Sequence, residues 1–368
     1  MLERPFFRHP EMLASAQRVA SFARLRAQKL DRDGAFPEDE ITALAEEGLL
    51  AAPLPPKLGG GGLGQDAGSA ALLAQVLMQI GAGSLPLGRI YEGHVNALGL
   101  VLAYGGPEQQ RRAAADALAG RLFGVWNTDD RQRPLCMEGG VLRGRKILAS
   151  GAGWVGRALV TAATPDGPLM LLLPLSRGER ADLSGWTAQG MRASATGAVD
   201  FEGMRVPSSA LIGEAGDYQR QPVFSGGAWR FLAVQTGGAA ELLSLMCRHL
   251  RELGRDSDPH QRVRAGESAA ALETATLWVE RAARHMAQDA LPPEAKVAYV
   301  NLARGVVERA ALEILTHAQR SVGLMGFMRP HPMERVARDL ATYLRQPAPD
   351  LALQMGGAFV LEQEGGPW

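Results

Sequence analysis

A chain of 368 residues, 46% of them hydrophobic, is long enough to bury a large core and predicts two or three domains rather than one. Lysine plus arginine and aspartate plus glutamate number 39 each, so no overall field exists to hold nucleic acid or an anionic membrane, and any anionic ligand must be bound locally. This balance argues against a nucleic-acid-binding protein. The two cysteines, Cys136 and Cys247, are too few for a disulfide framework or a cysteine-rich zinc site, which suits a reducing compartment.

The N-terminal segment does not resemble a signal peptide. In residues 1–13 the charges stand too close to the apolar residues to leave a hydrophobic region. Elsewhere no uninterrupted apolar run is long enough to span a bilayer. We therefore expect a cytoplasmic protein with no membrane span.

The first 120 residues have mostly helical spacing. Apolar residues between positions 16 and 25 form one stripe, and Pro37 followed by three acidic residues begins a second helix. Residues 51–66 are rich in proline and glycine and predict a loop. The segments 67–80, 90–104 and 109–119 predict three more helices. We expect an N-terminal helical domain over residues 1–120.

The pattern changes at residue 121 and again after Phe224. Short apolar or alternating runs predict a β domain, a barrel or sandwich, over residues 121–217. Long alanine-rich helices then predict a four-helix bundle over residues 218–368, with helices at 231–251, 263–288, 293–322 and 332–344. Residues 237–240 carry so little charge that we expect oligomerisation to bury the bundle. The predicted fold class is therefore α+β.

Several common motifs are absent or stand in the wrong context. Residues 59–64 contain GxGxxG, but no buried strand precedes them and no Lys-Ser/Thr pair follows, so a flexible loop is the better interpretation. The seven histidines have no metal-ligand spacing, so we expect no catalytic metal. No GxSxG elbow supports a hydrolase triad.

Two predicted strands in the β domain end in polar side chains. The first ends at Trp126, Asn127 and Thr128, whose indole, amide and hydroxyl could hold a planar heteroaromatic such as a flavin. A capped strand with a half-buried tryptophan is the alternative. The second strand, at residues 145–149, brings Ser150 to a glycine turn. Two such strands in one small domain favour a ligand site.

Landmarks in a fixed order run through nearly the whole chain. They are the GLL segment with its proline and glycines at 48–64, GGPEQ at 105–109, the strands at 125–129 and 144–151, the Gly-x-Arg-x-Ser-x-Thr-Gly run that leads to Val-Pro at 190–207, and the Gln-to-Arg-Asp segment at 319–339. In order and spacing together these landmarks resemble the acyl-CoA dehydrogenase family. The resemblance implies an N-terminal helical domain, a middle β domain and a C-terminal four-helix bundle, with FAD as the cofactor.

The resemblance also implies roles for the two strand ends. Trp126 and Thr128 would contact the isoalloxazine, with Asn127 beside them, and Ser150 would lie near its N5 or O4 edge. A flavin needs hydrogen-bond donors there to stabilise the negative charge that builds on reduction.

Three further positions are implied for the rest of the cofactor. Gln319 and Gly323 would meet the adenine end of FAD bound by a partner subunit. Arg255 is what remains of the segment with which the family grips the pyrophosphate. The resemblance thus implies a homodimer or homotetramer.

The catalytic carboxylate of the family has no counterpart at its usual positions. Dehydrogenation needs a carboxylate to remove the α-proton while a hydride goes to flavin N5. One usual position falls on Pro347 and the other on Trp229. Two candidates remain: Asp350, if the loop is displaced, and Glu92 on an apolar helix, for which pairing with Arg89 at i,i+3 is the alternative.

Three hypotheses about function follow. The first is a flavin-dependent dehydrogenase that oxidises an acyl thioester, bound to CoA or to an acyl carrier, and passes electrons to an electron-transfer partner. The second is a flavin monooxygenase fed by a reductase, because residues 345–347 also resemble the His-Asp-Pro segment of the superfamily's monooxygenases. The third is a member without catalysis that binds an acyl group or a partner protein.

Overall fold

The computed structural model describes residues 9–364. Residues 1–8, which belong to the segment predicted not to be a signal peptide, lie outside the described range. The first part of the chain is helical, as predicted. Its helices are α1 (His9–Leu30), α2 (Glu38–Glu46), the 3-10 turn η1 (Pro56–Leu58), α3 (Ala67–Gly83), α4 (Leu85–Tyr104) and α5 (Pro107–Leu118).

The middle of the chain forms short strands in three sheets. Their bounds are β1 (Phe123–Trp126), β2 (Cys136–Glu138), β3 (Val141–Arg143), β4 (Arg145–Ala149), β5 (Arg157–Ala162), β6 (Leu169–Pro174), β7 (Ala181–Asp182), β8 (Gly197–Asp200) and β9 (Leu211–Ile212). The sheet orders are β1-β5-β6-β9, β2-β3 and β4-β8-β7. β1 pairs with β5 in parallel, with Trp126 opposite Val160, and the other strand pairs are antiparallel. The sheets are open, so the barrel alternative was wrong.

The last part of the chain is a helical bundle. Its helices are α6 (Val223–Gly226), α7 (Trp229–Glu252), α8 (Pro259–Met286), α9 (Pro293–Val322), the 3-10 turn η5 (Gly323–Phe327), α10 (Pro332–Tyr343) and α11 (Pro349–Leu361). The sequence did not predict α11, because Pro347 and Pro349 suggest that the helical pattern ends there. Pro349 instead stands at the first position of the helix, where its missing N–H costs nothing.

The start of α4 also differs from the prediction. Residues 81–86 contain two glycines and a proline and looked like a break, but α4 begins at Leu85 rather than at position 90. The Ser84 hydroxyl accepts a hydrogen bond from the N–H of Leu87, and Pro86 stands in the first turn. This short connection leaves α3 and α4 adjacent, and it places Arg89 and Glu92 inside a regular helix.

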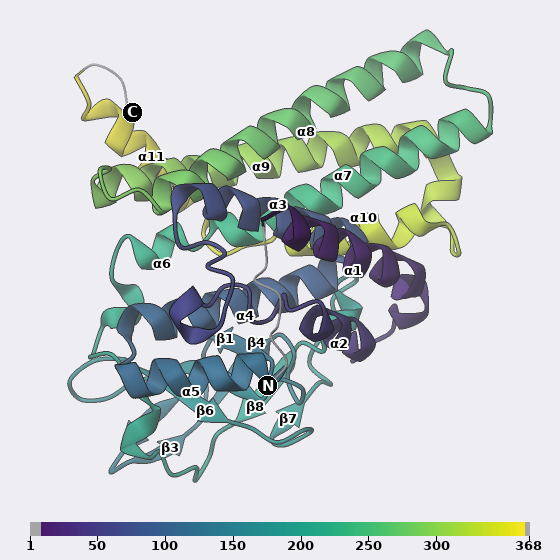
Figure 1. Cartoon of the computed structure of the whole chain (residues 1–368). Helices are drawn as coiled ribbons and strands as arrows, with labels where there is room; N and C mark the ends of the chain where they lie inside the picture. The colour runs from purple at the N-terminus through teal and green to yellow at the C-terminus, as the bar shows by residue number, and fades with distance from the viewer. Residues whose placement is uncertain (1–8, 365–368) are drawn as a thin grey trace.

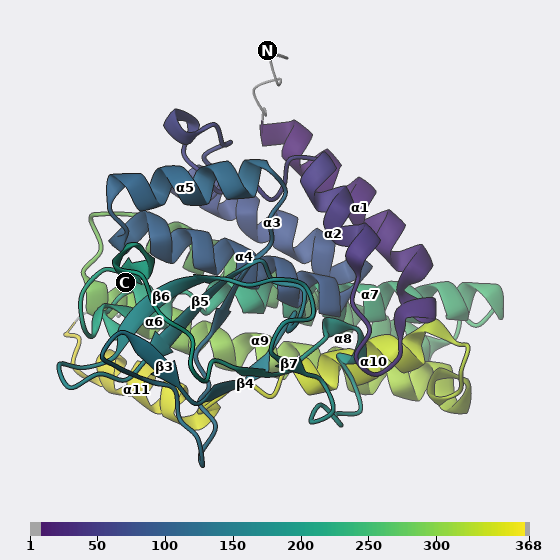
Figure 2. The same cartoon turned by 90° about the horizontal axis from the view of Figure 1, so that it is seen from below.

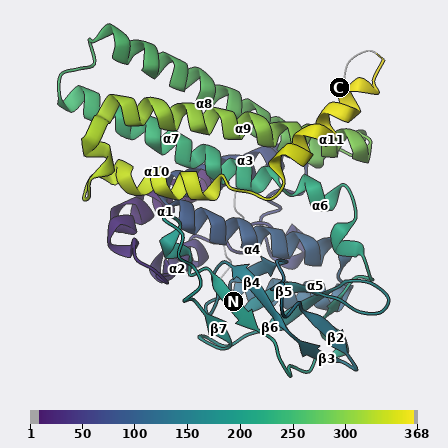
Figure 3. The same cartoon turned by 180° about the vertical axis from the view of Figure 1, so that it is seen from behind.

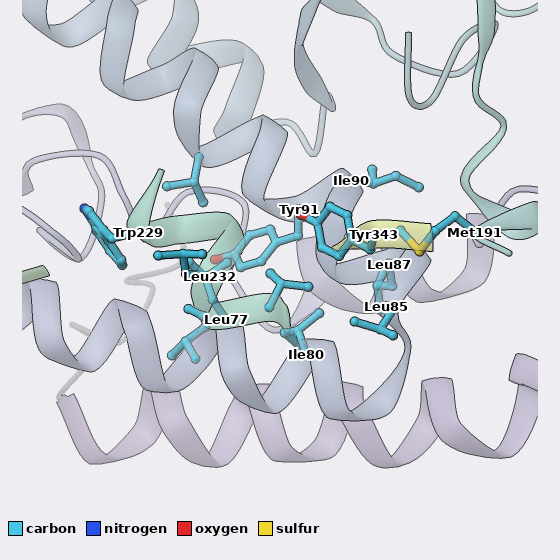
Figure 4. Packing of buried hydrophobic residues seen from close by; sticks show 14 of the residues in the cluster. Leu77, Ile80, Leu85, Leu87, Ile90, Tyr91, Met191, Trp229, Leu232 and Tyr343 are labelled. Atoms are coloured by element: carbon cyan, nitrogen blue, oxygen red, sulfur yellow. The ribbon is translucent and has the colours of Figure 1, made fainter. Parts of the chain in front are cut away.

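The helix α4 is the layer between the strands and the bundle (Figure 1), and the view from behind shows the same order (Figure 3). Seen from below, α5 and α1 flank the strands on one side (Figure 2). The buried core joins these layers, with side chains from α3, α4, α7 and α10 in contact (Figure 4): Leu77, Ile80, Leu87, Ile90, Tyr91, Leu232 and Tyr343. Any site at the end of β1 therefore faces helices from both helical parts.

Close backbone contact between α3 and α7 explains the small residues of the bundle. A Cβ on Gly237 would overlap the carbonyl oxygen of Met78, and a Cβ on Gly81 would overlap that of Val234. Residues 237–239 are thus buried within one chain. The low charge of this stretch is therefore explained by packing within the chain, and oligomerisation of the bundle stays a prediction.

None of the helices among residues 9–364 is long and apolar enough to cross a membrane. Over the same residues, no group of three or more histidine, cysteine, aspartate or glutamate side chains could hold a metal ion. The glycine run at 59–64 is a loop, as predicted, and it packs tightly because a Cβ on Gly60 would overlap the carbonyl oxygen of Leu54.

Candidate functional site

A cavity of about 800 Å³ lies where the β strands face α4, α7 and α10. This volume is in the range of pockets that hold a cofactor or a drug-sized ligand. Its lining differs in chemistry between the strands and the helices. The strands and their loops contribute Trp126, Asn127, Thr128, Ser150, Ser194 and Thr196, whereas the helices contribute Arg89, Glu92, Asn96, Arg230 and Tyr343.

The end of β1 is held in place by a buried lysine. Lys146 is fully buried, and its Nζ donates to Asp129 Oδ1 at 2.7 Å and to Thr161 Oγ1 at 3.1 Å. The Thr161 hydroxyl in turn donates to Asn127 Oδ1. The backbone of the next residue is also paired, since the carbonyl of Thr128 accepts from the N–H of Ile147 at 2.9 Å. A buried ammonium with these partners fixes the strand end that faces the cavity.

The indole of Trp126 has a fixed orientation. Only 2% of Trp126 is exposed, and its Nε1 donates to the carbonyl of Ser150 at 2.9 Å. The hydroxyl of Ser150 accepts from Thr196 Oγ1 at 3.3 Å, and Thr196 is hydrogen bonded to Ser194 Oγ at 2.7 Å. The two strand ends that the sequence singled out are therefore adjacent, and both line one cavity.

Helix α10 holds the loop that carries Ser194 and Thr196. The N–H of Met191 donates to Asp339 Oδ1 at 2.6 Å, and Arg338 Nη1 donates to the carbonyl of Gln189 at 2.5 Å. Between them Gly190 touches the α10 backbone, where a Cβ would overlap the carbonyl oxygen of Arg338. Burial raises the pKa of Asp339 to about 6.

Three polar residues of α4 face the cavity at helical spacing. Arg89 forms an ion pair with Glu92, and Asn96 Nδ2 donates to Glu92 Oε2 at 2.5 Å. The hydroxyl of Tyr343, on α10, donates to Glu92 Oε1 at 3.4 Å. Burial raises the pKa of Tyr343, and the adjacent carboxylate adds to this effect, so this phenol stays protonated. Both oxygens of Glu92 are therefore occupied.

A second arginine, Arg230 at the start of α7, stands beside this group. Its Nη1 donates to Asn96 Oδ1 at 2.9 Å. Its Nε is buried and has no acceptor within residues 9–364. Burial lowers the pKa of Arg230 to about 10, and the Glu92 carboxylate acts in the opposite direction.

Comparison with known families decides the identity of the fold. Residues 9–121 match the family model described as acyl-CoA dehydrogenase, N-terminal domain, and residues 218–344 match that of the acyl-CoA dehydrogenase, C-terminal domain. The chain belongs to the acyl-CoA dehydrogenase superfamily. The family resemblance predicted from the sequence is confirmed, as is the α+β fold with a C-terminal helical bundle.

Superfamily relatives differ in their named activities. The short-chain specific acyl-CoA dehydrogenase of Bos taurus mitochondria is 28% identical, over 85% of this chain and 80% of the relative. Among solved structures, TdsC of Paenibacillus sp. A11-2, a dibenzothiophene monooxygenase crystallised with FMN and indole, has a TM-score of 0.83 at 21% identity, over 97% of this chain and 99% of its own. A nitrososynthase from Micromonospora carbonacea var. africana has a TM-score of 0.81 at 21% identity, covering 98% and 99%. The fold alone does not fix the reaction.

Within this acyl-CoA dehydrogenase fold, five of the predicted site residues come together. Trp126, Asn127, Thr128, Ser150 and Glu92 all line the cavity. The ion pair of Glu92 with Arg89, considered from the i,i+3 spacing, is confirmed.

The other candidate base lies elsewhere. Asp350 is exposed in the first turn of α11 and does not line the cavity, whereas Pro347 does. The displaced-loop argument for Asp350 was wrong, because the residues after Pro347 turn into α11 and lead away from the site.

The remaining three predicted residues lie at the far end of the bundle. Arg255 is exposed between α7 and α8, and Gln319 and Gly323 stand where α9 ends. In Figure 1 these ends lie opposite α6. None of the three lines the cavity. Within one chain they are separate from the candidate site.

Sequence reasoning assigned no role to Arg230, nor to four further polar residues of the cavity: Asn96, Ser194, Thr196 and Tyr343. Asn96 could have been found, because it follows Glu92 by one helical turn. The others come from distant segments, and their approach to the site depends on tertiary packing.

Proposed function

We propose that this protein is a flavin-dependent oxidoreductase and that the cavity holds the flavin ring against the end of β1. Trp126 would give the ring a flat contact, and Asn127, Thr128 and Ser150 would offer hydrogen bonds at its polar edge. These groups suit a flavin because the indole is fixed by its bond to Ser150 and the strand end by Lys146. FMN and FAD share this ring, and FAD is our first choice because the relatives include acyl-CoA dehydrogenases.

For FAD, the adenine end would need further contacts. We propose Gln319 and Gly323 for it, supplied by a partner subunit, with Arg255 near the pyrophosphate. The segment after Gly323 supports this arrangement, because it exposes Leu324, Met325 and Phe327, an apolar surface that a homodimer or homotetramer would cover. Light scattering on the purified protein tests the oligomeric state, and a monomer would contradict it.

For the reaction, we propose oxygen-dependent oxidation of a small molecule. One observation carries this choice: among the described residues that line the cavity, Glu92 is the one carboxylate, and Arg89, Asn96 and Tyr343 occupy both its oxygens. A carboxylate held in this way is poorly placed to remove an α-proton. A reduced flavin held there would supply the two electrons that, with two protons, let one atom of molecular oxygen enter the substrate and the other leave as water. A separate reductase would provide those electrons.

A second candidate is dehydrogenation of an acyl thioester, bound to CoA or to an acyl carrier. It is favoured by the position of Glu92 in the cavity wall and by the bovine relative. In this case Glu92 would have to exchange its bond to Arg89 for one to the substrate, and an electron-transfer partner would reoxidise the flavin.

The first test is the absorption spectrum of the protein after expression in the bacterial cytoplasm and purification. Flavin bands are expected. Their absence after titration with FAD and with FMN would leave only the hypothesis of a non-catalytic binding protein.

The second test is anaerobic mixing with acyl-CoA thioesters of several chain lengths. No bleaching is expected, whereas bleaching that Glu92→Gln abolishes would establish the dehydrogenase. Oxygen consumption driven by a flavin reductase, with an oxygenated product, is the outcome that supports our choice.

A further inference from the structure

The guanidinium of Arg230 has more donors than the protein uses. Among the described residues its one hydrogen bond runs from Nη1 to Asn96 Oδ1, while Nε is buried without an acceptor. No carboxylate in that part of the chain forms an ion pair with it. Arg230 is half-buried and its guanidinium lies 5.0 Å from the centre of the Trp229 ring, but it has no carboxylate partner, and burial lowers its pKa. This arrangement calls for an anion from outside the chain.

The cavity as a whole has an excess of positive charge. Four arginines line it, namely Arg89, Arg230, Arg304 and Arg345, against the single carboxylate of Glu92. Two of them have carboxylate partners, since Arg89 pairs with Glu92 and Arg345 with Glu308 at 2.5 Å, and Arg304 donates to the carbonyl of Pro347 at 2.5 Å. Glu92 is thus paired with Arg89, and its attraction to Arg230 offsets the burial of that guanidinium only in part.

The surroundings of Arg230 leave room for a ligand group. A Cβ added to Gly99 would find Arg230 Nη2 at 4.0 Å as its nearest neighbour, and one on Gly227 would lie 3.4 Å from Nη1. A Cβ at either glycine would be in ordinary van der Waals contact with the guanidinium, so the two glycines leave that space beside it open. Asn96, which accepts from Nη1 and donates to Glu92, holds the arginine in position.

We propose that Arg230 binds a carboxylate carried by the substrate. The substrate is then a small organic acid or a larger molecule that carries a carboxylate group. A guanidinium takes a carboxylate through two parallel N–H bonds, which fixes orientation as well as charge. The inference rests on the proposed function, in which this cavity receives the substrate. The helix wall with Arg230 and Glu92 faces the substrate, whereas the strand wall with Trp126 and Thr128 holds the flavin.

The test uses butyrate and its neutral isostere butyramide with the full-length protein, as purified and after flavin addition. Melting temperature is followed by scanning fluorimetry over a titration of each compound. Butyrate is expected to raise the melting temperature by roughly 2–6 °C at saturating concentration, and butyramide to leave it unchanged. In Arg230→Gln the apparent Kd for butyrate should rise at least about tenfold. The Kd of Arg230→Lys should lie between those of the wild type and Arg230→Gln. Arg345→Gln is the matched control, because that arginine also lines the cavity but has its own carboxylate partner.

Four outcomes would overturn the assignment. They are no stabilisation by butyrate, equal stabilisation of wild type and Arg230→Gln, a larger Arg230-dependent shift with inorganic phosphate, and loss of flavin absorbance in Arg230→Gln. The last would mean that Arg230 serves the cofactor. Circular dichroism checks that each variant folds. If wild type binds no flavin yet shows the Arg230-dependent shift with butyrate, the proposed redox function fails while the acid site stands.

Discussion

A buried histidine predicts how the protein responds to acid. His94, on α4, is fully buried. Its Nε2 donates to the carbonyl of Leu50 at 2.7 Å, and its Nδ1 accepts from the N–H of Phe123 at 3.0 Å. One nitrogen is a donor and the other an acceptor, which only the neutral ring allows. Protonation would place two N–H groups against each other and break the link between α4 and β1.

The size of the effect follows from the shift in pKa. Burial lowers the pKa of His94 from 6.5 to about 4, and the hydrogen bond to Leu50 opposes this only in part. As pH falls through this interval the unfolded chain takes up the proton first, so the free energy of unfolding decreases. The difference corresponds to roughly 3 kcal/mol between pH 7 and pH 4.

The assay is urea denaturation of wild type and His94→Gln between pH 4 and pH 7.5. Glutamine can still donate to Leu50 but does not titrate. The stability difference between wild type and variant should shrink by roughly 3 kcal/mol towards pH 4. His260→Gln, which replaces an exposed histidine, is the control for the substitution itself. A difference that stays constant across the pH range would refute the reasoning.

Three further substitutions test other parts of the fold. Asp339→Asn removes a carboxyl whose pKa burial raises from 3.8 to about 6. The folded state keeps this proton to higher pH than the unfolded chain, so wild-type stability should fall by roughly 2 kcal/mol from pH 4 to pH 6, and the variant should lose that slope in urea denaturation. Lys146→Met leaves Asp129 without its cation, and we expect a lower melting temperature and weaker retention of flavin on gel filtration. Gly237→Ala should cost about 1–3 kcal/mol or more in urea denaturation because its Cβ overlaps α3, whereas Gly266→Ala, with nothing nearby, should be neutral or stabilising by up to about 1 kcal/mol. Unchanged stability or flavin retention in the first-named variant of each case would contradict its argument.

Much of the fold could be predicted because its signals are local. Helical periodicity and proline or glycine punctuation located most helices to within a few residues, and the polar ends of β1 and β4 identified two patches that line one cavity. The start of α4 and the whole of α11 were missed because prolines and glycines can stand either at the start of a helix or after its end. Pro86 and Pro349 open helices, although from the sequence each could equally end one.

The candidate site was harder to predict because its chemistry depends on pairs that are distant in sequence. Glu92 and Arg89 are three residues apart, and their ion pair could be predicted, but Arg230 reaches Asn96 and Tyr343 reaches Glu92 only through packing of α4 against α7 and α10. These contacts decide whether a carboxylate is free to act as a base.

Nothing in the sequence alone decides between Asp350 and Glu92, whereas in the structure Asp350 lies outside the cavity and Glu92 is held by its partners. The fold is that of the acyl-CoA dehydrogenase superfamily, but Glu92 is paired with Arg89 and Arg230 has no carboxylate partner. These two features favour an acidic substrate over a fatty acyl chain. Arg230 is therefore the residue whose substitution tells most about this enzyme.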